Sequence, residues 1–392
     1  MYKVSKILLR NILNSAGLYS IEAEVVLESG ETGVASAPMA IKGGSREQII
    51  TKEIYKKISF YNEQIQILIG NYQNQSVWDE KLKKYIVIWG TDITLSLSLA
   101  FARAVAMKLR LHLTDYMQIL GNIRKIEKRK VYLIPIFSGG VHCKGEFQSI
   151  QQIMFAIDSY DFKDTLYEIL EFYENLERKI SESGWLTGYS ASSGFIVKEL
   201  SVNEQLSLLM EEIQKSEFCN HLSVALDVAS EHLKNKNGYR FYGENLTNEK
   251  MEETLIKFTE NYPITYLEDP FSYEDREHWV SLRNRIKEDC HIFSDDLTAT
   301  QVQYIDRDCA DGAIIKMKQV GTLTATLEMS EKLKEHGMIR CVSHRSYETE
   351  DTFMCDLGVA TNAEYMKIGG PRRGDRVSKY NQLLRIFSRG EI

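Results

Sequence analysis

Three acidic residues each close a short apolar run of this sequence. Asp227 ends VALD, Glu268 ends ITYLE and Asp295 follows CHIFS. Apolar runs of this length are typical of buried parallel strands, and carboxylates at their ends are expected to converge on one rim of a barrel. The sequence therefore predicts an oxygen-lined metal site at that rim.

The series of polar residues continues along the chain. Lys316 follows GAII, His344 follows IRCVS and Lys367 follows AEYM, so that the six residues stand 21 to 41 positions apart. Each interval accommodates one strand, a crossover helix and the next strand. Any one of these residues alone would be read as a solvated loop charge, but the series predicts consecutive βα units of a barrel with its active site at the C-terminal face.

The composition narrows the class of protein. A chain of 392 residues with 43% hydrophobic and 26% charged residues is typical of a soluble globular protein with room for two domains. The net charge of −7 argues against a general nucleic-acid or anionic-membrane surface. An anionic ligand is therefore expected to bind in a local basic pocket.

The apolar runs and the cysteines indicate where in the cell the protein is expected and whether its cysteines form disulfides. The first residues, MYKVSKILLRNILNSAG, contain only broken apolar runs, and no later stretch was expected to serve as a membrane span. We expect a cytoplasmic protein that does not insert into a membrane. The six cysteines lack a C-x-x-C pairing and are predicted to be free thiols.

The chain is predicted to divide into a small α+β domain, residues 1–126, and a barrel, residues 127–392. The first 60 residues or so read as strands with a Glu-Ser-Gly turn, followed by helical sequence that includes the apolar GTDITLSLSLAFARAVAMKLRLHLTDYMQIL. The charge run IRKIEKRK marks the boundary and reads as a solvated linker. Beyond it, strand-like runs alternate with amphipathic helical segments, as a barrel requires.

The residue types at the strand ends suggest a reaction class. Three carboxylates without a partnering His or Cys suit Mg²⁺ first and Mn²⁺ second. Lys316 alone would be read as a surface lysine, but with Lys367 nearby, repulsion and burial are expected to lower the pKa of one of the two and make it a general base. A divalent ion that neutralises a substrate carboxylate acidifies the adjacent C–H bond. These residues predict proton abstraction α to a carboxylate.

The segment Ser343-His344-Arg345-Ser346 places hydroxyl, imidazole and guanidinium donors on one turn. This combination suits a phosphate or carboxylate group. An isolated His-Arg pair would more often be an ordinary ion pair.

At these motifs the sequence resembles the enolase family, the glycolytic 2-phosphoglycerate dehydratases. The similarity runs from ILNSAG to SKYNQLLRI and is strongest in SVALDVAS, YLEDPF, SDDLT, IIKMKQVGT, SHRSYETEDTF and MKIGGP. The resemblance implies an N-terminal α+β domain followed by an enolase-type (βα)8 barrel. It also implies that Asp227, Glu268 and Asp295 bind the catalytic Mg²⁺ and that Lys316 removes the C2 proton.

The resemblance also implies a substrate site and an assembly. Lys367 would hold the substrate carboxylate together with the metal, and Arg345 and Ser346 would hold the phosphate. His344 and His142, the latter in SGGVHCKG, would line the site. The substrate would be a small phosphorylated carboxylate, and the protein would be a homodimer.

Two acidic positions of the family are changed. The family's D-E-G-G-F segment, whose Glu acts as general acid on the leaving hydroxyl, reads Ala191-Ser192-Ser193-Gly194-Phe195 here. The Glu of Q-E-F-M matches Gln152, and Gln151 then matches the family's substrate-contacting glutamine. Ser192 and Gln152 thus stand with Lys316 as the candidate catalytic positions.

Two further departures concern the metal and the dimer. The family's S-G-A-S-T-G loop, whose second serine ligates a second Mg²⁺, reads SAPMAI here with Met39 at that serine. Met39 is a poor Mg²⁺ ligand, so one Mg²⁺ is expected rather than two. Ser15-Ala16-Gly17 lacks the arginine that pairs across the family's dimer with an acid matching Asp375, so a different dimer geometry is expected.

Three functional hypotheses follow. The first is an enolase-type lyase acting on 2-phosphoglycerate, phosphoenolpyruvate or a close analogue. The second is an enolase-like enzyme with a changed reaction in a specialised pathway, for example one that makes phosphonates. The third is a non-catalytic sensor of a phosphoglycerate-type ligand. Because an acid–base group contributes about 10²- to 10⁴-fold in rate, the loss of two carboxylates is expected to impair dehydration.

Overall fold

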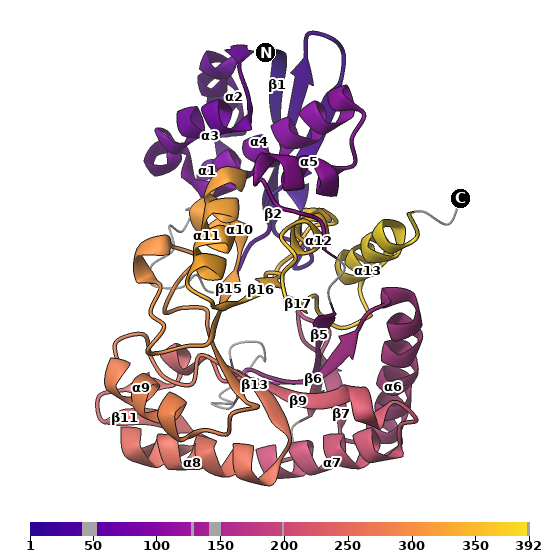
Figure 1. Cartoon of the computed structure of the whole chain (residues 1–392), viewed down its shortest axis with the longest axis vertical. Coiled ribbons are helices and arrows are strands. Elements are labelled where there is room, and N and C mark those ends of the chain that lie inside the picture. The colour runs from indigo at the N-terminus through magenta and orange to yellow at the C-terminus, as the bar shows by residue number, and fades with distance from the viewer. Residues whose placement is uncertain (41–52, 127–128, 141–149, 198–199, 390–392) are drawn as a thin grey trace.

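The computed structural model describes residues 1–40, 53–126, 129–140, 150–197 and 200–389. A small unit formed by the N-terminal third of the chain sits at one end of a ring of strands surrounded by helices (Figure 1). The predicted division at residues 126 and 127 adjoins residues outside the described ranges and stays a prediction.

The N-terminal unit is built on an antiparallel sheet. Its strand order is β3-β2-β1-β4, with β1 Tyr2–Leu13, β2 Tyr19–Leu27, β3 Thr32–Ser36 and β4 Gly70–Tyr72. The turn between β2 and β3 falls at the predicted Glu-Ser-Gly. The strand β4 lies where the sequence predicted only helix, because three residues are too few to show an alternating pattern.

Helices cover this sheet. They are α1 Glu53–Lys56, α2 Ile58–Gln64, α3 Gln75–Lys83, α4 Ile86–Leu109 and α5 Leu113–Leu120. The predicted apolar helix pair corresponds to α4 and α5, and α4 bends at Gly90, whose φ is 76°. Nearly all of its residues from Thr91 to Ala106 are buried, because β2 and β3 pack on one side and barrel helices on the other.

By length and composition alone, α4 qualifies as a membrane span, which the prediction of no such stretch had overlooked. Most of the apolar window is buried inside the structure. It is the core helix of the N-terminal unit.

Eight strands close the barrel in the order β5-β6-β9-β13-β14-β15-β16-β17, and β17 pairs with β5. Their bounds are β5 Lys130–Ser138, β6 Gln152–Ser159, β9 Leu222–Asp227, β13 Ile264–Glu268, β14 His291–Ser294, β15 Gly312–Ile315, β16 Ile339–Ser343 and β17 Tyr365–Lys367. The six strands with the predicted polar ends are parallel, as expected.

The barrel is mixed rather than purely parallel, because β6 runs antiparallel to both β5 and β9. A plain (βα)8 pattern therefore does not describe the first two strands. The start of β6 lies beside the end of β9, where Gln152 pairs with Asp227. Residues that begin β6 thus reach the same rim as residues that end the parallel strands.

Helices surround the ring (Figure 1). They are α6 Phe162–Glu182, α7 Val202–Lys215, α8 Asn248–Asn261, α9 Arg276–Arg285, α10 Met317–Val320, α11 Leu323–Glu335, α12 Phe353–Ala360 and α13 Gly374–Phe387. The predicted amphipathic segments form α7 and α11. A capping box at Ser201 begins α7, and the Thr322 hydroxyl accepts from Ala325 N at the start of α11.

Small strands lie outside the ring. The hairpin of β7 Leu186–Tyr189 and β8 Phe195–Val197 joins the edge of β5. A separate sheet contains β10 Lys234–Asn235, β11 Gly238–Phe241 and β12 Glu244–Leu246.

The barrel interior is filled by side chains. Residues of successive strands, among them Leu133, Met154, Tyr266 and Phe293, form one buried cluster. The five cysteines in the described ranges are free thiols, as predicted, and four of them are buried.

A polar cluster of the N-terminal unit holds the start of the barrel helix α11. The Asp79 carboxylate accepts from Gln75 Nε2 at 3.0 Å, from Ser98 Oγ at 2.7 Å and from Thr324 N at 2.9 Å. A carboxylate at a helix N-terminus is favoured by the exposed backbone N–H groups there. Burial nevertheless raises the pKa of Asp79 to about 6.

This pKa predicts a pH dependence of stability. The pKa of Asp79 is about 3.8 in the unfolded chain and about 6 in the folded protein, so folding takes up a proton between these two pH values. The contribution of Asp79 to stability therefore falls as pH rises through this window and is constant above it. Relative to Asp79→Asn, the wild type should lose up to about 3 kcal/mol between pH 4 and 6.5. Urea denaturation of both proteins across this range measures the difference. The exposed Asp289→Asn controls for loss of a carboxylate, and a difference that does not change with pH would contradict the raised pKa.

Candidate active site

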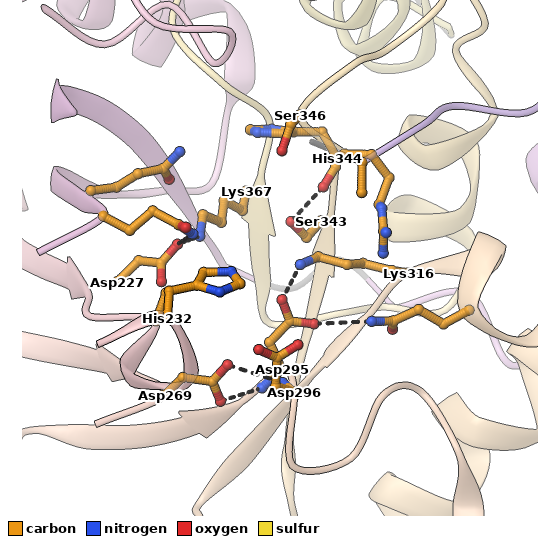
Figure 2. Close-up of a pocket in the computed structure, with 16 residues that line it drawn as sticks. Asp227, His232, Asp269, Asp295, Asp296, Lys316, Ser343, His344, Ser346 and Lys367 are labelled. Carbon is orange, nitrogen blue, oxygen red and sulfur yellow. Dashed lines mark hydrogen bonds and ion pairs between the residues drawn. The ribbon is translucent and has the colours of Figure 1, made fainter. Parts of the chain in front are cut away.

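One polar cavity lies at the rim where the parallel strands end. Of the residues predicted from the sequence, those that line it are Gln151, Gln152, Asp227, Asp295, Lys316, His344, Arg345, Ser346 and Lys367. Figure 2 shows the labelled side chains around this space, at the ends of strands or in the segments that follow them. His142 lies outside the described residues.

Lys367 is held by two carboxylates of neighbouring strands. Its Nζ lies 2.7 Å from Asp227 Oδ2 and 2.8 Å from Glu268 Oε2, and all three side chains are buried. Glu268 also accepts from the Tyr266 hydroxyl at 2.7 Å. Burial and the neighbouring Asp227 raise the pKa of Glu268 to about 7. Glu268 therefore sits behind Lys367 rather than among the residues that line the cavity.

Lys316 forms an ion pair with Asp295. Burial is the largest influence on the pKa of Asp295 and acts to raise it, but Lys316, Arg345 and Lys367 together lower this pKa. Burial is likewise the largest influence on the pKa of Lys316 and acts to lower it, but Asp295 and Glu268 together raise this pKa. For Lys367 the result is the same, because Asp227 and Glu268 outweigh burial.

The expectation that one lysine has a lowered pKa is therefore wrong for this arrangement. Each ammonium group faces carboxylates at close range, and these outweigh both burial and the repulsion between the two lysines.

Three aspartates at this rim form a candidate metal site. Asp269, Asp295 and Asp296 each offer a carboxylate oxygen, and these oxygens lie within 4.8 Å of one another. Burial, with Asp295 nearby, raises the pKa of Asp296 to about 7, and burial with Asp296 and Asp295 raises that of Asp269. An all-oxygen set with this excess of buried negative charge fits a hard divalent cation.

Asp269 also shapes the turn that carries the other two aspartates. Its two oxygens accept from the backbone N–H groups of Asp295 and Asp296, each at 2.9 Å. Sequence reasoning did not single out Asp269 and Asp296, although each directly follows a predicted metal ligand, Glu268 or Asp295. His232 also lines the cavity, and no pattern in the sequence pointed to it.

The wall around Gln152 is neutral. Gln152 Nε2 donates to Ser192 Oγ at 2.7 Å, the Ser192 and Ser190 hydroxyls lie 3.1 Å apart, and Ser138 Oγ donates to Ser190 Oγ at 2.8 Å. Ser192 is fully buried and does not line the cavity. It contacts Gln152 from behind, so amide and hydroxyl groups occupy the place of the two carboxylates that the resemblance would have supplied.

The N-terminal unit is joined to the rim by the main chain. Met39 N donates to Tyr347 O at 2.8 Å, and Tyr347 N donates to Met39 O at 2.9 Å. The sulfur of Met39 accepts from Asn14 Nδ2 and from the Tyr55 hydroxyl, each at 3.3 Å. The Met39 side chain is thus engaged with the N-terminal unit, while the next residue, Ala40, lines the cavity.

Arg376 of α13 connects two segments of the rim. This fully buried guanidinium donates through Nη2 to Arg345 O and Ser346 O at 2.9 Å and to Ala191 O at 3.1 Å. Gly369 leaves room for it, because a Cβ there would lie 2.6 Å from Arg376 Cδ. Sequence reasoning missed Arg376, since nothing in the sequence shows that this arginine is buried.

Replacing Arg376 should loosen both segments. In Arg376→Lys a single ammonium group replaces the planar fork and leaves at least one buried carbonyl without its donor, so a loss of about 1.5–3 kcal/mol in unfolding free energy is expected. Urea denaturation measures this loss. Arg372→Lys, at a half-exposed arginine, is the control and should change stability by less than about 0.5 kcal/mol. Equal stability of Arg376→Lys and the wild type would refute the bridging role.

Comparison with known families supports the architecture. The family model described as "Enolase, C-terminal TIM barrel domain" matches residues 130–389. The match begins at the first residue of β5 and continues to the end of the described residues after α13. It therefore covers every strand of the ring and every residue that lines the cavity except Ala40. The chain belongs to the enolase family.

Proposed function

We propose that this protein is a Mg²⁺-dependent lyase of the enolase type that abstracts a proton α to a carboxylate, acting on 2-phosphoglycerate, phosphoenolpyruvate or a close analogue. The observation that carries the proposal is the gathering of the buried Lys367 and the partly buried Lys316 with the strand-end carboxylates at a single rim. This arrangement combines a candidate base, an anion-binding group and cation ligands.

In the proposed mechanism, Asp227 and Asp295, which line the cavity, and Glu268, which lies behind Lys367, would hold the ion, and Asp269 and Asp296 would add further negative charge beside it. The chemistry of the donors fits Mg²⁺, because they are carboxylate oxygens. A divalent ion held there would supply positive charge that makes the C–H bond next to the substrate carboxylate more acidic, and Asp295, shared with the ion, would hold the Lys316 proton less tightly. Met39 faces the N-terminal unit, which supports a single Mg²⁺ rather than two.

The remaining residues bind and orient the substrate. Lys316 takes the proton from the carbon next to the carboxylate, and Lys367 binds that carboxylate. Arg345 and Ser346, with His344 beside them, bind the phosphate, for which guanidinium and hydroxyl donors are suited. Gln151 donates to Asp227 Oδ2 at 3.1 Å, so it would contact both the substrate and a residue that holds the metal.

The neutral wall favours a second candidate function. Gln152 and Ser192 supply hydrogen bonds but no readily released proton, so expulsion of hydroxide has no carboxylic acid at these two positions. A changed reaction on an analogue, for example in a phosphonate pathway, needs no such acid. A non-catalytic sensor of the same ligand class would use the same binding groups.

The proposed setting follows from the family and the composition. The substrate is a small phosphorylated carboxylate, and the protein acts in the cytoplasm as a homodimer. Its dimer geometry differs from the family's, because Ala16 replaces the arginine that would face Asp375.

The decisive assay is conversion of 2-phosphoglycerate to phosphoenolpyruvate with Mg²⁺ by the wild type and by a Ser192→Glu/Gln152→Glu double variant. Turnover by the wild type would support an enolase in the plain sense. Activity gained only by the double variant would show that the binding residues serve a different reaction. If neither protein converts 2-phosphoglycerate but both still bind Mg²⁺ and substrate analogues, the result would favour the sensor.

Substitutions at Lys316 and Asp295 test the assigned roles. Lys316→Ala should lower whichever activity the wild type shows by about 10²- to 10⁴-fold, because the base is lost, while Mg²⁺ binding is largely retained. Asp295→Asn should weaken both turnover and Mg²⁺ binding. Steady-state kinetics and calorimetric titration with Mg²⁺ separate the two effects. Full activity in Lys316→Ala would rule out this lysine as the base.

A further inference from the structure

We propose that Thr300 and Gln319 are a positioning pair that fixes the Asp295 carboxylate for cation binding. The inference rests on the proposed function, since it assigns Asp295 to the metal. Neither residue belongs to the ligand set, and Thr300 does not line the cavity. Both side chains are buried.

A directed chain of hydrogen bonds links the two residues to Asp295. Lys316 N donates to Thr300 Oγ1 at 2.9 Å, Thr300 Oγ1 donates to Gln319 Oε1 at 2.5 Å, and Gln319 Nε2 lies 3.3 Å from Asp295 Oδ1. A threonine hydroxyl has one proton to give. Its nearest acceptor is Gln319 Oε1, since the other, Ile314 O, lies at 3.4 Å. The Gln319 amide is thereby oriented with its NH₂ group toward Asp295.

The backbone places the Thr300 hydroxyl at some cost. Ala299 and Thr300 have φ values of 44° and 55°, in the left-handed region that β-branched residues rarely adopt. Such a conformation is strained and persists only where surrounding interactions hold it. Ala299 N donates to Asp295 O at 2.7 Å, so the turn that carries Asp295 also sets the position of Thr300.

The consequence is a carboxylate held from two sides. Lys316 contacts Asp295 Oδ2, as Figure 2 shows, and Gln319 contacts Asp295 Oδ1. Without Gln319 the carboxylate can rotate and offer both oxygens to Lys316. Such a rotation strengthens an ion pair that competes with a cation. Loss of an interaction that orients a metal ligand typically weakens metal affinity about 10- to 100-fold.

The test is Mg²⁺ titration of the full chain by calorimetry without substrate. Thr300→Val, which keeps the shape and removes the hydroxyl, and Gln319→Leu should each raise the Kd for Mg²⁺ about 10- to 100-fold. Thr300→Ser keeps the hydroxyl and should restore the Kd to within about threefold of the wild-type value. Both residues act through the same series of hydrogen bonds. The double variant should therefore bind Mg²⁺ no more weakly than the single variant with the higher Kd.

Melting temperatures without Mg²⁺ separate positioning from general stability. Variants that melt lower but keep the wild-type Kd would overturn the proposal, as would strictly additive losses in the double variant or a wild type that binds no Mg²⁺. A wild type that binds Mg²⁺, with weakened variants but no turnover of any candidate substrate, would support the positioning pair and count against the proposed function. Unchanged affinity in variants of an active enzyme would leave the function standing and the positioning pair refuted.

Discussion

The site depends on buried negative charge collected at one rim of the barrel. Asp227, Glu268 and Asp295 reach this rim because parallel strands place their ends together, and burial makes their mutual repulsion strong. Lys316 and Lys367 balance part of this charge through direct ion pairs. The lysines are paired in this arrangement, and the surrounding carboxylates also form a candidate site for a cation that would take over part of their role.

Much of the barrel and its rim could be predicted from the sequence, because the relevant signals are local. An apolar run followed by a charged or polar residue indicates both a strand and the place of its last side chain, so the six strand-end residues were found from these runs and their spacing. The direction of β6 could not be found in this way, since its apolar run reads the same in either direction. The antiparallel pairing arises from the partners β5 and β9.

Several site features depend on proximity between distant segments. Whether a lysine loses or gains basicity depends on which charges face it, and the repulsion inferred between Lys316 and Lys367 was outweighed by carboxylates at closer range. Ser192 could be matched to a family position, but its burial behind Gln152 is visible only in three dimensions. Arg376 likewise reads as one more charged residue of an amphipathic helix until its three carbonyl partners are seen.

The reversed direction of β6 divides the rim into two kinds of wall. Side chains at the ends of the parallel strands are fixed by ladders on both sides, so moving one of them means moving a strand. Gln151 instead stands just before β6, outside the ladders, and Gln152 is the first residue of that strand, paired with Ser138 and Asp227. That wall can change in chemistry or in the length of its connection while the ladder beyond it keeps its register. A barrel with one reversed strand thus combines a rigid rim of carboxylates and lysines with a side whose chemistry can vary more freely.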